Sequence, residues 1–189
     1  MLVAGVDEAG RGPLAGPVVA AAAILLPSQI RVLHAFGLTD SKKLSPRKRE
    51  RLFALLRDLG VLWKAQAASP ERIDDMNILQ ASLWCMERSV RALPVPPDLV
   101  VVDGTVRIPG LGLPQRTLPK ADERVLAVAA ASVVAKVLRD RVLTVLDKVY
   151  PGWGFARHKG YPTAEHRRIL EEKGLSPAHR RSFSWRVLP

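Results

Sequence analysis

Four acidic residues stand at places in this sequence where they could bind divalent cations. Asp7 and Glu8 end one short apolar run, and Asp103 ends a second, β-branched run. Asp122 stands where the pattern predicts the start of a long helix. Hard cations such as Mg²⁺ take carboxylate oxygens as ligands. Because ligands collect at strand ends in α/β sheets, Asp7 and Asp103 could converge on one cation if their strands are neighbours.

Each of these acids also has an ordinary structural explanation. Asp7-Glu8 could form a turn, Asp103-Gly104 is a common turn pair, and Asp122 is a suitable helix N-cap. The dipole of a helix beginning at Asp122 would keep that carboxylate ionised, which suits a metal ligand. Neighbouring strand residues point to opposite faces, so Asp7 and Glu8 can share one site only if the chain bends at residues 8–10.

A glycine-rich turn with one cation, Gly10-Arg11-Gly12, follows the first two acids after a single alanine. Exposed backbone amides beside an arginine suit a phosphate group. The spacing Gly10-x-Gly12-x-x-Ala15 also matches a loose dinucleotide-binding fingerprint, which requires a helix to begin where the glycines stop. Proline and glycine at positions 13, 16 and 17 prevent that helix, and the sequence has no Walker A motif. We therefore expect no nucleotide cofactor.

The excess of positive charge indicates a polyanionic partner. The chain has 29 Lys and Arg against 18 Asp and Glu, which gives a net charge of +11 and a pI near 10.5. Phosphate contacts by such residues dominate affinity for nucleic acids, although charge alone also fits an ordinary basic protein. The cations cluster in residues 40–51, 157–161 and 179–181, and Tyr161 is available to stack on a sugar or base. A solvated charged face is the alternative explanation.

Histidine and cysteine chemistry has little support. The four histidines show no zinc-ligand spacing with Cys85, and no nucleophile motif accompanies them. His158 lies in a basic segment and is a candidate phosphate contact, with a packed or solvated side chain as the alternative. Cys85 stands in an apolar helical pattern and is expected to be a buried thiol.

The length and the hydropathy indicate one α/β domain spanning residues 1–189. The chain shows no targeting segment, and its longest apolar stretches fall short of the ~20 residues that span a bilayer. We expect a cytoplasmic protein without membrane association. Strands are expected over residues 2–6, 17–26, 61–67, 99–102 and 116–118, and helices over 46–59, 75–93, 122–149 and 164–173. Alternating elements of this kind predict a mixed central sheet, with the first two strands antiparallel.

Several motifs in the chain resemble, in order and spacing, those of the bacterial type 2 ribonucleases H, the ribonuclease HII family. They are residues 5–13 (GVDEAGRGP), 40–45 (DSKKLS), 102–104 (VDG), 120–122 (KAD), 129–137 (AAASVVAKV), 139–141 (RDR), 158–163 (HKGYPT) and 176–183 (SPAHRRSF). The resemblance covers nearly the whole chain. Because several rare motifs agree at once, the set is specific.

The resemblance implies a ribonuclease-H-like fold, a mixed sheet flanked by helices with a small helical C-terminal part at residues 150–189. It implies a metal-dependent hydrolase that cuts the RNA strand of RNA–DNA hybrids. It also implies incision 5′ of single ribonucleotides embedded in duplex DNA, which leaves 3′-hydroxyl and 5′-phosphate ends. The matching acids are Asp7, Glu8, Asp103 and Asp122, expected to be catalytic and to hold two Mg²⁺ or Mn²⁺ ions.

The resemblance also implies particular substrate contacts. Gly10-Arg11-Gly12 matches the loop whose backbone reads the ribose 2′-hydroxyl, and Tyr161 matches the aromatic that senses the sugar beyond the cut. The lysines that match positions near the nucleic-acid path are Lys42, Lys43 and Lys159. The expected partners are RNA–DNA hybrids and ribonucleotide-containing duplex DNA, and we expect the protein to act as a monomer.

The sequence departs from the family pattern at two points, and two rival functions stay open. Glu123 stands where the family often has a small or neutral residue, so it could perturb metal affinity and is a rival ligand to Asp122. Because the chain starts almost at its first strand, we expect it to lack the N-terminal platform domain of type 3 enzymes. The rivals are a non-catalytic basic module that binds nucleic acid and a structure-selective DNA nuclease. Acids at strand ends argue against a pure binder, because they repel phosphate.

Overall fold

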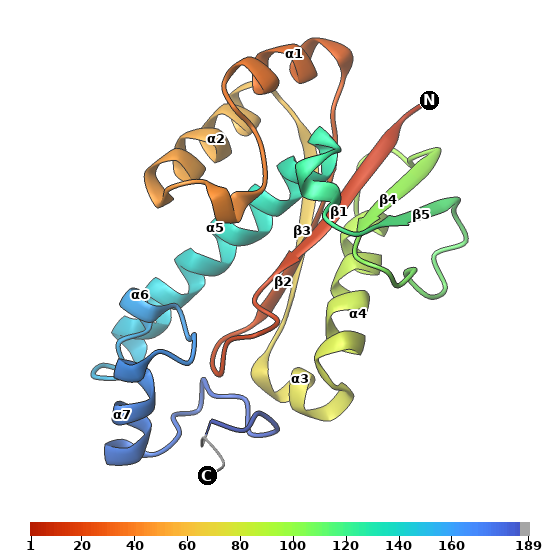
Figure 1. The fold of residues 1–189 in the computed structure, drawn as a ribbon. Coiled ribbons are helices and arrows are strands. Elements are labelled where there is room, and N and C mark those ends of the chain that lie inside the picture. The colour runs from red at the N-terminus through yellow and green to blue at the C-terminus, as the bar shows by residue number, and fades with distance from the viewer. Residues whose placement is uncertain (186–189) are drawn as a thin grey trace.

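The computed structural model describes residues 1–185, and in this part of the chain five strands form one mixed sheet (Figure 1). The strands are β1 (Val3–Ala9), β2 (Val18–Ile24), β3 (Leu62–Ala68), β4 (Leu99–Asp103) and β5 (Gln115–Leu118), in the spatial order β3-β2-β1-β4-β5. β2 is antiparallel to both β1 and β3. β4 runs parallel to both β1 and β5. The predicted mixed α/β sheet is confirmed.

Helices cover both faces of this sheet (Figure 1). They are α1 (Pro27–Ala35), α2 (Pro46–Asp58), α3 (Pro70–Met76), α4 (Ile78–Arg91), α5 (Leu126–Val149), α6 (Phe155–His158) and α7 (Ala164–Lys173), with the 3-10 turns η1 (Ser41–Lys43) and η2 (Ala121–Glu123). Successive side chains of a strand point to opposite faces, which divides the core into two layers. One layer packs against α4, and the other packs against α5, α1 and α2.

The contact between β1 and α5 is unusually close. A Cβ atom placed on Gly5 of β1 would lie 2.1 Å from the main-chain nitrogen of Val128 in α5. The first half of α5 is made of small residues, and the alanines at positions 127, 129, 130 and 131 are buried. Since both surfaces are small here, helix and strand backbones approach each other and hold the end of β1 in a fixed place.

Two predicted helices differ from the structure, and a further helix was not predicted. The helix expected over residues 75–93 is two helices, α3 and α4, because Asn77 has a φ of 65° and caps α4 through the amides of Leu79 and Gln80. The long helix begins at Leu126 rather than at Asp122, which lies in η2. Helix α1 was not predicted, although it has Pro27 in its first turn and the Gln29 side chain accepting from the Leu26 amide.

The chain after α5 returns to the loop between β1 and β2. The amide of Gly16 donates to the Ala178 carbonyl and the amide of Arg180 to the Leu14 carbonyl, each at 2.8 Å. The expected domain (1–189) and C-terminal segment (150–189) include residues 186–189, which lie outside the described part of the chain. Within residues 1–185, none of the helices combines the length and the apolar character needed to cross a bilayer.

Candidate active site

Three of the four predicted acids meet at the end of the central strands. Asp7, Asp103 and Asp122 each offer a carboxylate oxygen, and these oxygens all lie within 4.8 Å of one another. The register explains the meeting: Val6 of β1 pairs with Val102 of β4, so the following residues of the two parallel strands, Asp7 and Asp103, are neighbours. The predicted convergence of these two strand ends is confirmed.

Asp103 brings the third acid into place. Its Oδ1 atom accepts a hydrogen bond of 2.8 Å from the main-chain N–H of Ala121, the first residue of η2. Lys120 before it has a φ of 58°, a left-handed conformation that turns the chain sharply into η2. Asp122 follows at once, 4% exposed, with its carboxyl group in the cluster. One carboxylate therefore positions the turn that carries another.

The cluster is electrostatically strained without a cation. Burial raises the pKa of Asp7 well above its usual range, and the carboxylates of Glu8 and Asp103 add to this effect. Burial, followed by repulsion from Asp40 and Asp103, raises the pKa of Asp122 to about 6. Among the described residues, Asp122 Oδ2 is a buried side-chain oxygen without a hydrogen-bond partner. Divalent cations prefer such oxygen ligands, so the residues present fit a metal site.

The expectation that a helix dipole keeps Asp122 ionised is wrong. Asp122 lies in the three-residue turn η2, and the long helix starts only at Leu126. Its pKa is raised rather than lowered, because burial and the neighbouring acids outweigh any favourable dipole. The turn therefore leaves Asp122 able to bind a proton or a cation.

Glu8 lies beside the cluster and not among its three members. The strand continues regularly through Glu8 to Ala9, where these residues pair with Ala20 and Val19, so the chain does not bend directly after Asp7. The Glu8 carboxylate lies 3.6 Å from the Arg11 guanidinium. It still interacts with the site, because burial and then Asp103 raise the pKa of Glu8 against the opposing effect of Arg11. Its predicted role as a metal ligand stays a prediction.

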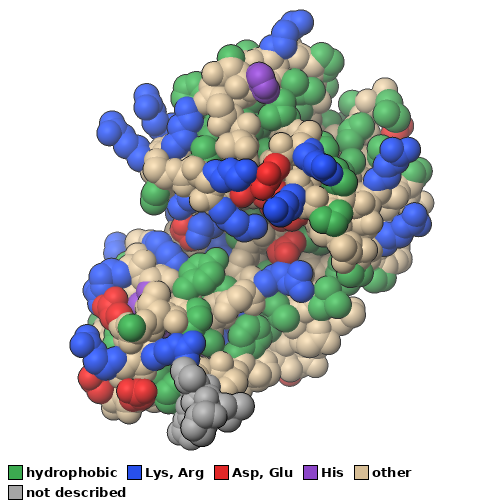
Figure 2. Space-filling model, viewed as in Figure 1, with side chains coloured by type: hydrophobic (Ala, Val, Ile, Leu, Met, Phe, Trp, Pro, Cys, Tyr) green, Lys and Arg blue, Asp and Glu red, His purple; other side chains and the backbone are tan. Residues whose placement is uncertain are grey.

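Of the two lysines in η1, Lys42 faces the acids and Lys43 does not. Burial alone would lower the pKa of Lys42, but the carboxylates of Asp7, Asp40, Asp122 and Asp103 outweigh it and raise the pKa. Lys43 lies 3.0 Å from Glu123, and this ion pair engages the carboxylate that was a rival ligand to Asp122. Figure 2 shows acidic side chains near the middle of this face, with Lys and Arg side chains around them.

The glycine-rich loop lies directly beyond the acids. The carbonyls of Gly10 and Arg11 accept hydrogen bonds of 2.6 and 3.0 Å from the buried guanidinium of Arg180. Gly10 has a φ of 100°, and a Cβ there would lie 2.0 Å from Nε of Arg139. A Cβ on Gly12 would instead meet nothing within 4 Å. The chain itself therefore requires a glycine at position 10, whereas position 12 faces open space.

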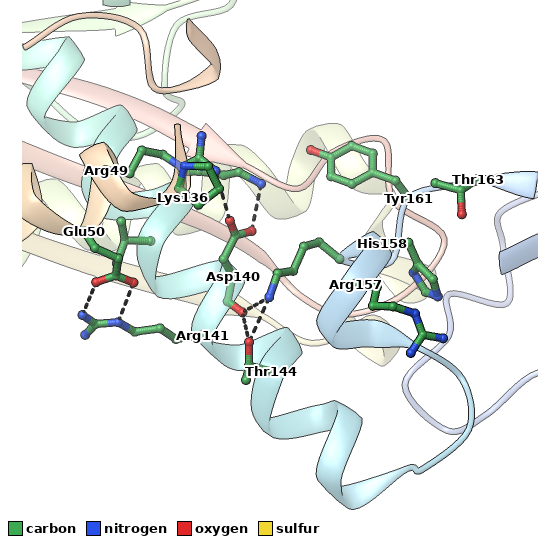
Figure 3. A pocket seen from close by; sticks show the side chains of 13 residues that line it. Arg49, Glu50, Lys136, Asp140, Arg141, Thr144, Arg157, His158, Tyr161 and Thr163 are labelled. Atoms are coloured by element: carbon green, nitrogen blue, oxygen red, sulfur yellow. Dashed lines mark hydrogen bonds and ion pairs between the residues drawn. The ribbon is translucent and has the colours of Figure 1, made fainter. Parts of the chain in front are cut away.

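A basic groove lies between α2, α5 and the segment after α6 (Figure 3). It has a volume of about 530 Å³, and its lining includes the predicted substrate residues Lys159 and Tyr161. Asp140 in its wall lies 2.8 Å from Lys136 and 3.7 Å from Arg49. Lys159 Nζ reaches the hydroxyl of Thr144 at 2.9 Å, and Tyr161 is 41% exposed. The groove thus presents cations and one aromatic ring to a ligand.

The comparisons with known proteins identify the family. The family model described as ribonuclease HII matches residues 4–186. The chain belongs to the ribonuclease HII family. It is 50% identical to the ribonuclease HII of Dechloromonas aromatica (strain RCB) over 182 residues, which cover 96% of this chain and 90% of that protein. The crystal structure of ribonuclease H2 from Pyrococcus horikoshii OT3 matches with a TM-score of 0.84 and 33% identity, covering 98% of this chain and 95% of that one.

A second curated relative is a member of the same family. The ribonuclease HII of Vibrio cholerae serotype O1 (strain ATCC 39541 / Classical Ogawa 395 / O395) is 48% identical over 182 residues, covering 96% of this chain and 86% of that protein. Members of the ribonuclease HII family are metal-dependent endonucleases that cleave the RNA strand of RNA–DNA hybrids. The chain is therefore a hydrolase, and the alternative of a non-catalytic binding module is wrong.

Sequence reasoning missed Asp40, a further acid at this ribonuclease HII site. Asp40 is 6% exposed, and its Oδ1 accepts the Lys42 amide at 2.8 Å. It therefore caps η1 and places Lys42 toward the acids. It also raises the pKa of Asp122. The signal was present in the sequence, because an aspartate directly before a turn is a common N-cap.

His158, the candidate phosphate contact, is instead a packed histidine. It is 7% exposed, its Nε2 lies 2.6 Å from the Trp153 carbonyl, and its ring stacks on that of His166 with centroids 4.0 Å apart. His179 Nδ1 accepts the Ser176 amide, so its Nε2 donates to His166 Nε2 at 2.9 Å. His166 Nδ1 then donates to the Tyr161 carbonyl at 3.0 Å. A chain of neutral histidines thus ends on Tyr161.

Proposed function

We propose that this protein incises duplex DNA on the 5′ side of single embedded ribonucleotides, in addition to cleaving RNA–DNA hybrids, with two Mg²⁺ or Mn²⁺ ions bound at the acids. The observation that carries the proposal is the meeting of Asp7, Asp103 and Asp122 directly beside the Gly10–Gly12 loop. A site for cations that bind phosphate thus adjoins a loop with open space above it. We further propose that the protein acts as a monomer in the cytoplasm.

The acids supply the catalytic part of the proposed site. Asp7, Asp103 and Asp122 would hold the cations, and Glu8, whose carboxylate interacts electrostatically with that of Asp103, would be a further ligand. When bound, a pair of divalent cations supplies an activated water and stabilises the leaving 3′-oxygen of an in-line displacement. Lys42 faces the same carboxylates and offsets part of their charge, which reduces their repulsion of an approaching phosphate.

The loop supplies the selection of ribose. The 2′-hydroxyl is the group that distinguishes RNA from DNA at a given position, so a selective enzyme must place hydrogen-bonding groups against it. The open space at Gly12 allows a sugar to approach the backbone, where any side chain would keep it away. Arg11, half exposed and 3.6 Å from Glu8, joins this loop to the acids.

The basic groove supplies the binding of the duplex. Its lysines and arginines suit the phosphates on either side of the cut, and Lys159, one of the lining residues, donates to the hydroxyl of Thr144 in its wall. The exposed ring of Tyr161 can stack on the sugar that follows the ribonucleotide. A deoxyribose fits there, because it lacks the hydroxyl that would meet the ring.

A comparison of substrates tests the proposal. The protein would be incubated with Mg²⁺ or with Mn²⁺ and three end-labelled duplexes of one sequence: a duplex with one ribonucleotide, a full hybrid and plain DNA. We expect a single cut 5′ of the lone ribonucleotide, cuts along the hybrid and none in DNA, with all cutting lost in EDTA. An intact single-ribonucleotide duplex would refute the proposal, and cutting of plain DNA would favour a structure-selective DNA nuclease.

A further inference from the structure

Two arginine side chains lie fully buried beneath the loop between β1 and β2. Arg139 comes from α5 and is 0% exposed, and Arg180 comes from the segment after α7 and is 1% exposed. Charged side chains are rarely buried so completely unless a partner compensates the charge. Here the guanidinium groups donate six hydrogen bonds to main-chain carbonyls, five of them in the loop.

Arg180 fixes which way the peptide groups of the loop point. Its guanidinium donates to the carbonyls of Gly10, Arg11 and Gly16, at 2.6, 3.0 and 3.0 Å. In a trans peptide the carbonyl of one residue points opposite to the N–H of the next. When the carbonyls of Gly10 and Arg11 point inward to Arg180, the N–H groups of Arg11 and Gly12 therefore point away from it. Those N–H groups are the donors that the proposed function needs for a 2′-hydroxyl.

Arg139 ties this loop to the segment that carries Tyr161. It donates to the carbonyls of Ala15 and Pro17 in the loop and to the carbonyl of Lys159, each at 3.0 Å. Its guanidinium carbon lies 5.8 Å from the centroid of the Tyr161 ring. One rigid fork thus bonds the far end of the Gly10–Pro17 loop and the residue two positions before Tyr161, and so ties together the two segments that carry the proposed substrate contacts.

Two glycines fit closely against this arrangement. A Cβ on Gly10 would lie 2.0 Å from Arg139 Nε, and a Cβ on Gly160 would lie 2.5 Å from the Ala15 carbonyl oxygen. The Leu14 amide also donates to the Gly160 carbonyl at 2.8 Å. The loop and the Tyr161 segment are therefore in direct backbone contact, which the bonds of both arginines reinforce.

The backbone around Arg180 is itself held in place. The Asp74 carboxylate of α3 accepts the amides of Arg181 and Ser182, at 2.8 and 3.0 Å. On the other side, the Arg180 amide donates to the Leu14 carbonyl at 2.8 Å. The backbone that carries the Arg180 side chain is therefore fixed on both sides. The three bonds of its guanidinium then connect the loop to α3 through the C-terminal segment.

We propose that Arg180 and Arg139 are positioning residues, which orient the Gly10–Gly12 amides and fix their separation from Tyr161, so that ribose selection depends on side chains that do not touch the substrate. This inference rests on the proposed function of the loop. It differs from a general packing role in what it predicts: replacement lowers the rate of the chemical step and loosens one loop, while the duplex still binds through the groove.

The test compares two identical substitutions at adjacent positions. Arg180→Lys keeps the charge but lacks the planar fork whose three separate nitrogens each reach one carbonyl, and Arg181→Lys makes the same change at an exposed neighbour. For each variant kcat and KM would be measured on the single-ribonucleotide duplex, together with the melting temperature and the hydrogen exchange of residues 10–17. Because a small misplacement of a reacting group lowers the rate of the chemical step steeply, we expect kcat of Arg180→Lys to fall about ten- to a hundredfold with KM nearly unchanged.

The expected pattern includes faster exchange of the loop amides in Arg180→Lys and wild-type behaviour in Arg181→Lys. If Arg180→Lys does not fold, the same measurements on Arg139→Lys test the positioning role. In a separate experiment, added guanidinium ion should restore part of the kcat that Arg180→Ala loses. A folded Arg180→Lys with wild-type kcat would overturn the inference, as would unchanged loop exchange. If the wild type leaves the ribonucleotide duplex intact, the proposed function fails, whereas loop exchange still decides whether the arginines position the loop.

Discussion

Asp103 accepts a hydrogen bond of 2.8 Å from the main-chain N–H of Ala121, and this bond closes the acidic site. Asp103 ends a strand, whereas Ala121 opens a short turn well separated from it in sequence. The bond fixes the turn so that the next residue, Asp122, comes within 4.8 Å of Asp7 and Asp103. The same carboxylate is thus a member of the cluster and the anchor for another member.

Replacing Asp122 by Asn should stabilise the metal-free protein. Its folded-state pKa of about 6 lies above the unfolded value of 3.8, so metal-free stability falls as pH rises from about 4 to about 6 and stays reduced above that. Asp122→Asn should therefore raise the free energy of unfolding at pH 7 by about 1–3 kcal/mol, measured by urea denaturation in EDTA. The control is Asp58→Asn, which makes the same change at the last residue of α2, outside the acidic cluster. Equal stability of Asp122→Asn and wild type would contradict the electrostatic account.

The buried histidines should make the protein sensitive to acid. Burial lowers the pKa of His166 and of His179 to about 4, below the usual value of 6.5. Stability from these groups is complete above about pH 6.5 and is lost as pH falls toward 4, by up to about 3 kcal/mol each. The loss of unfolding free energy between pH 7 and pH 5 should be smaller in His166→Gln than in the parent, while His34→Gln keeps the parental loss. The acids with raised pKa values make the protein more stable as pH falls, but they do so equally in parent and variants, so their effect drops out of the comparison.

The two glycines of the loop should respond differently to alanine. Gly10→Ala places a Cβ 2.0 Å from Arg139 Nε at a φ of 100°, so it should lower both stability and activity. Gly12→Ala meets nothing within 4 Å, so its melting temperature should match the wild type while cleavage at a single ribonucleotide falls. The two melting curves and the two values of kcat/KM check this pair. Full activity in Gly12→Ala would remove that position from the ribose contact.

Removing the ring of Tyr161 should impair incision at a lone ribonucleotide. Stacking of an aromatic side chain on a base is worth about 1–3 kcal/mol, and a contact with the sugar of similar strength predicts a loss of roughly five- to 150-fold in kcat/KM for Tyr161→Ala. Tyr161→Phe keeps the ring and should stay near the wild-type value. Steady-state kinetics on the single-ribonucleotide duplex measure both. If both variants behave alike, stacking is not the role of this residue.

The sequence allowed prediction of the sheet class and placed Asp7 and Asp103 at strand ends, because both features depend on local apolar runs. The convergence of the two acids was predicted only on the condition that their strands are neighbours, and that pairing belongs to the tertiary structure. It did not reveal the break at Asn77, since the apolar spacing that predicted the helix begins only at Leu79, after the break. The raised pKa of Asp122 depends on Asp40 and on burial, which only the folded chain brings together.

Arg180 is the clearest example of a role that the sequence pattern does not reveal. In the sequence it belongs to a basic cluster with His179 and Arg181, a pattern that indicates a phosphate-binding surface. In the structure it is 1% exposed and bonds the loop carbonyls, and His179 belongs to the buried histidine chain. A guanidinium that binds carbonyls and one that binds phosphate have the same sequence signal. Only tertiary structure separates the two roles.

The acids at the ends of β1 and β4 are expected to perform the cleavage. The most direct measurement is a pair of assays on Asp7→Asn with the single-ribonucleotide duplex: cleavage in Mg²⁺ or Mn²⁺, and binding in EDTA at fixed salt. The account predicts that cleavage is abolished, while the dissociation constant stays close to that of the wild type, because the groove and the loop are intact. Wild-type cleavage rates in Asp7→Asn would contradict the account.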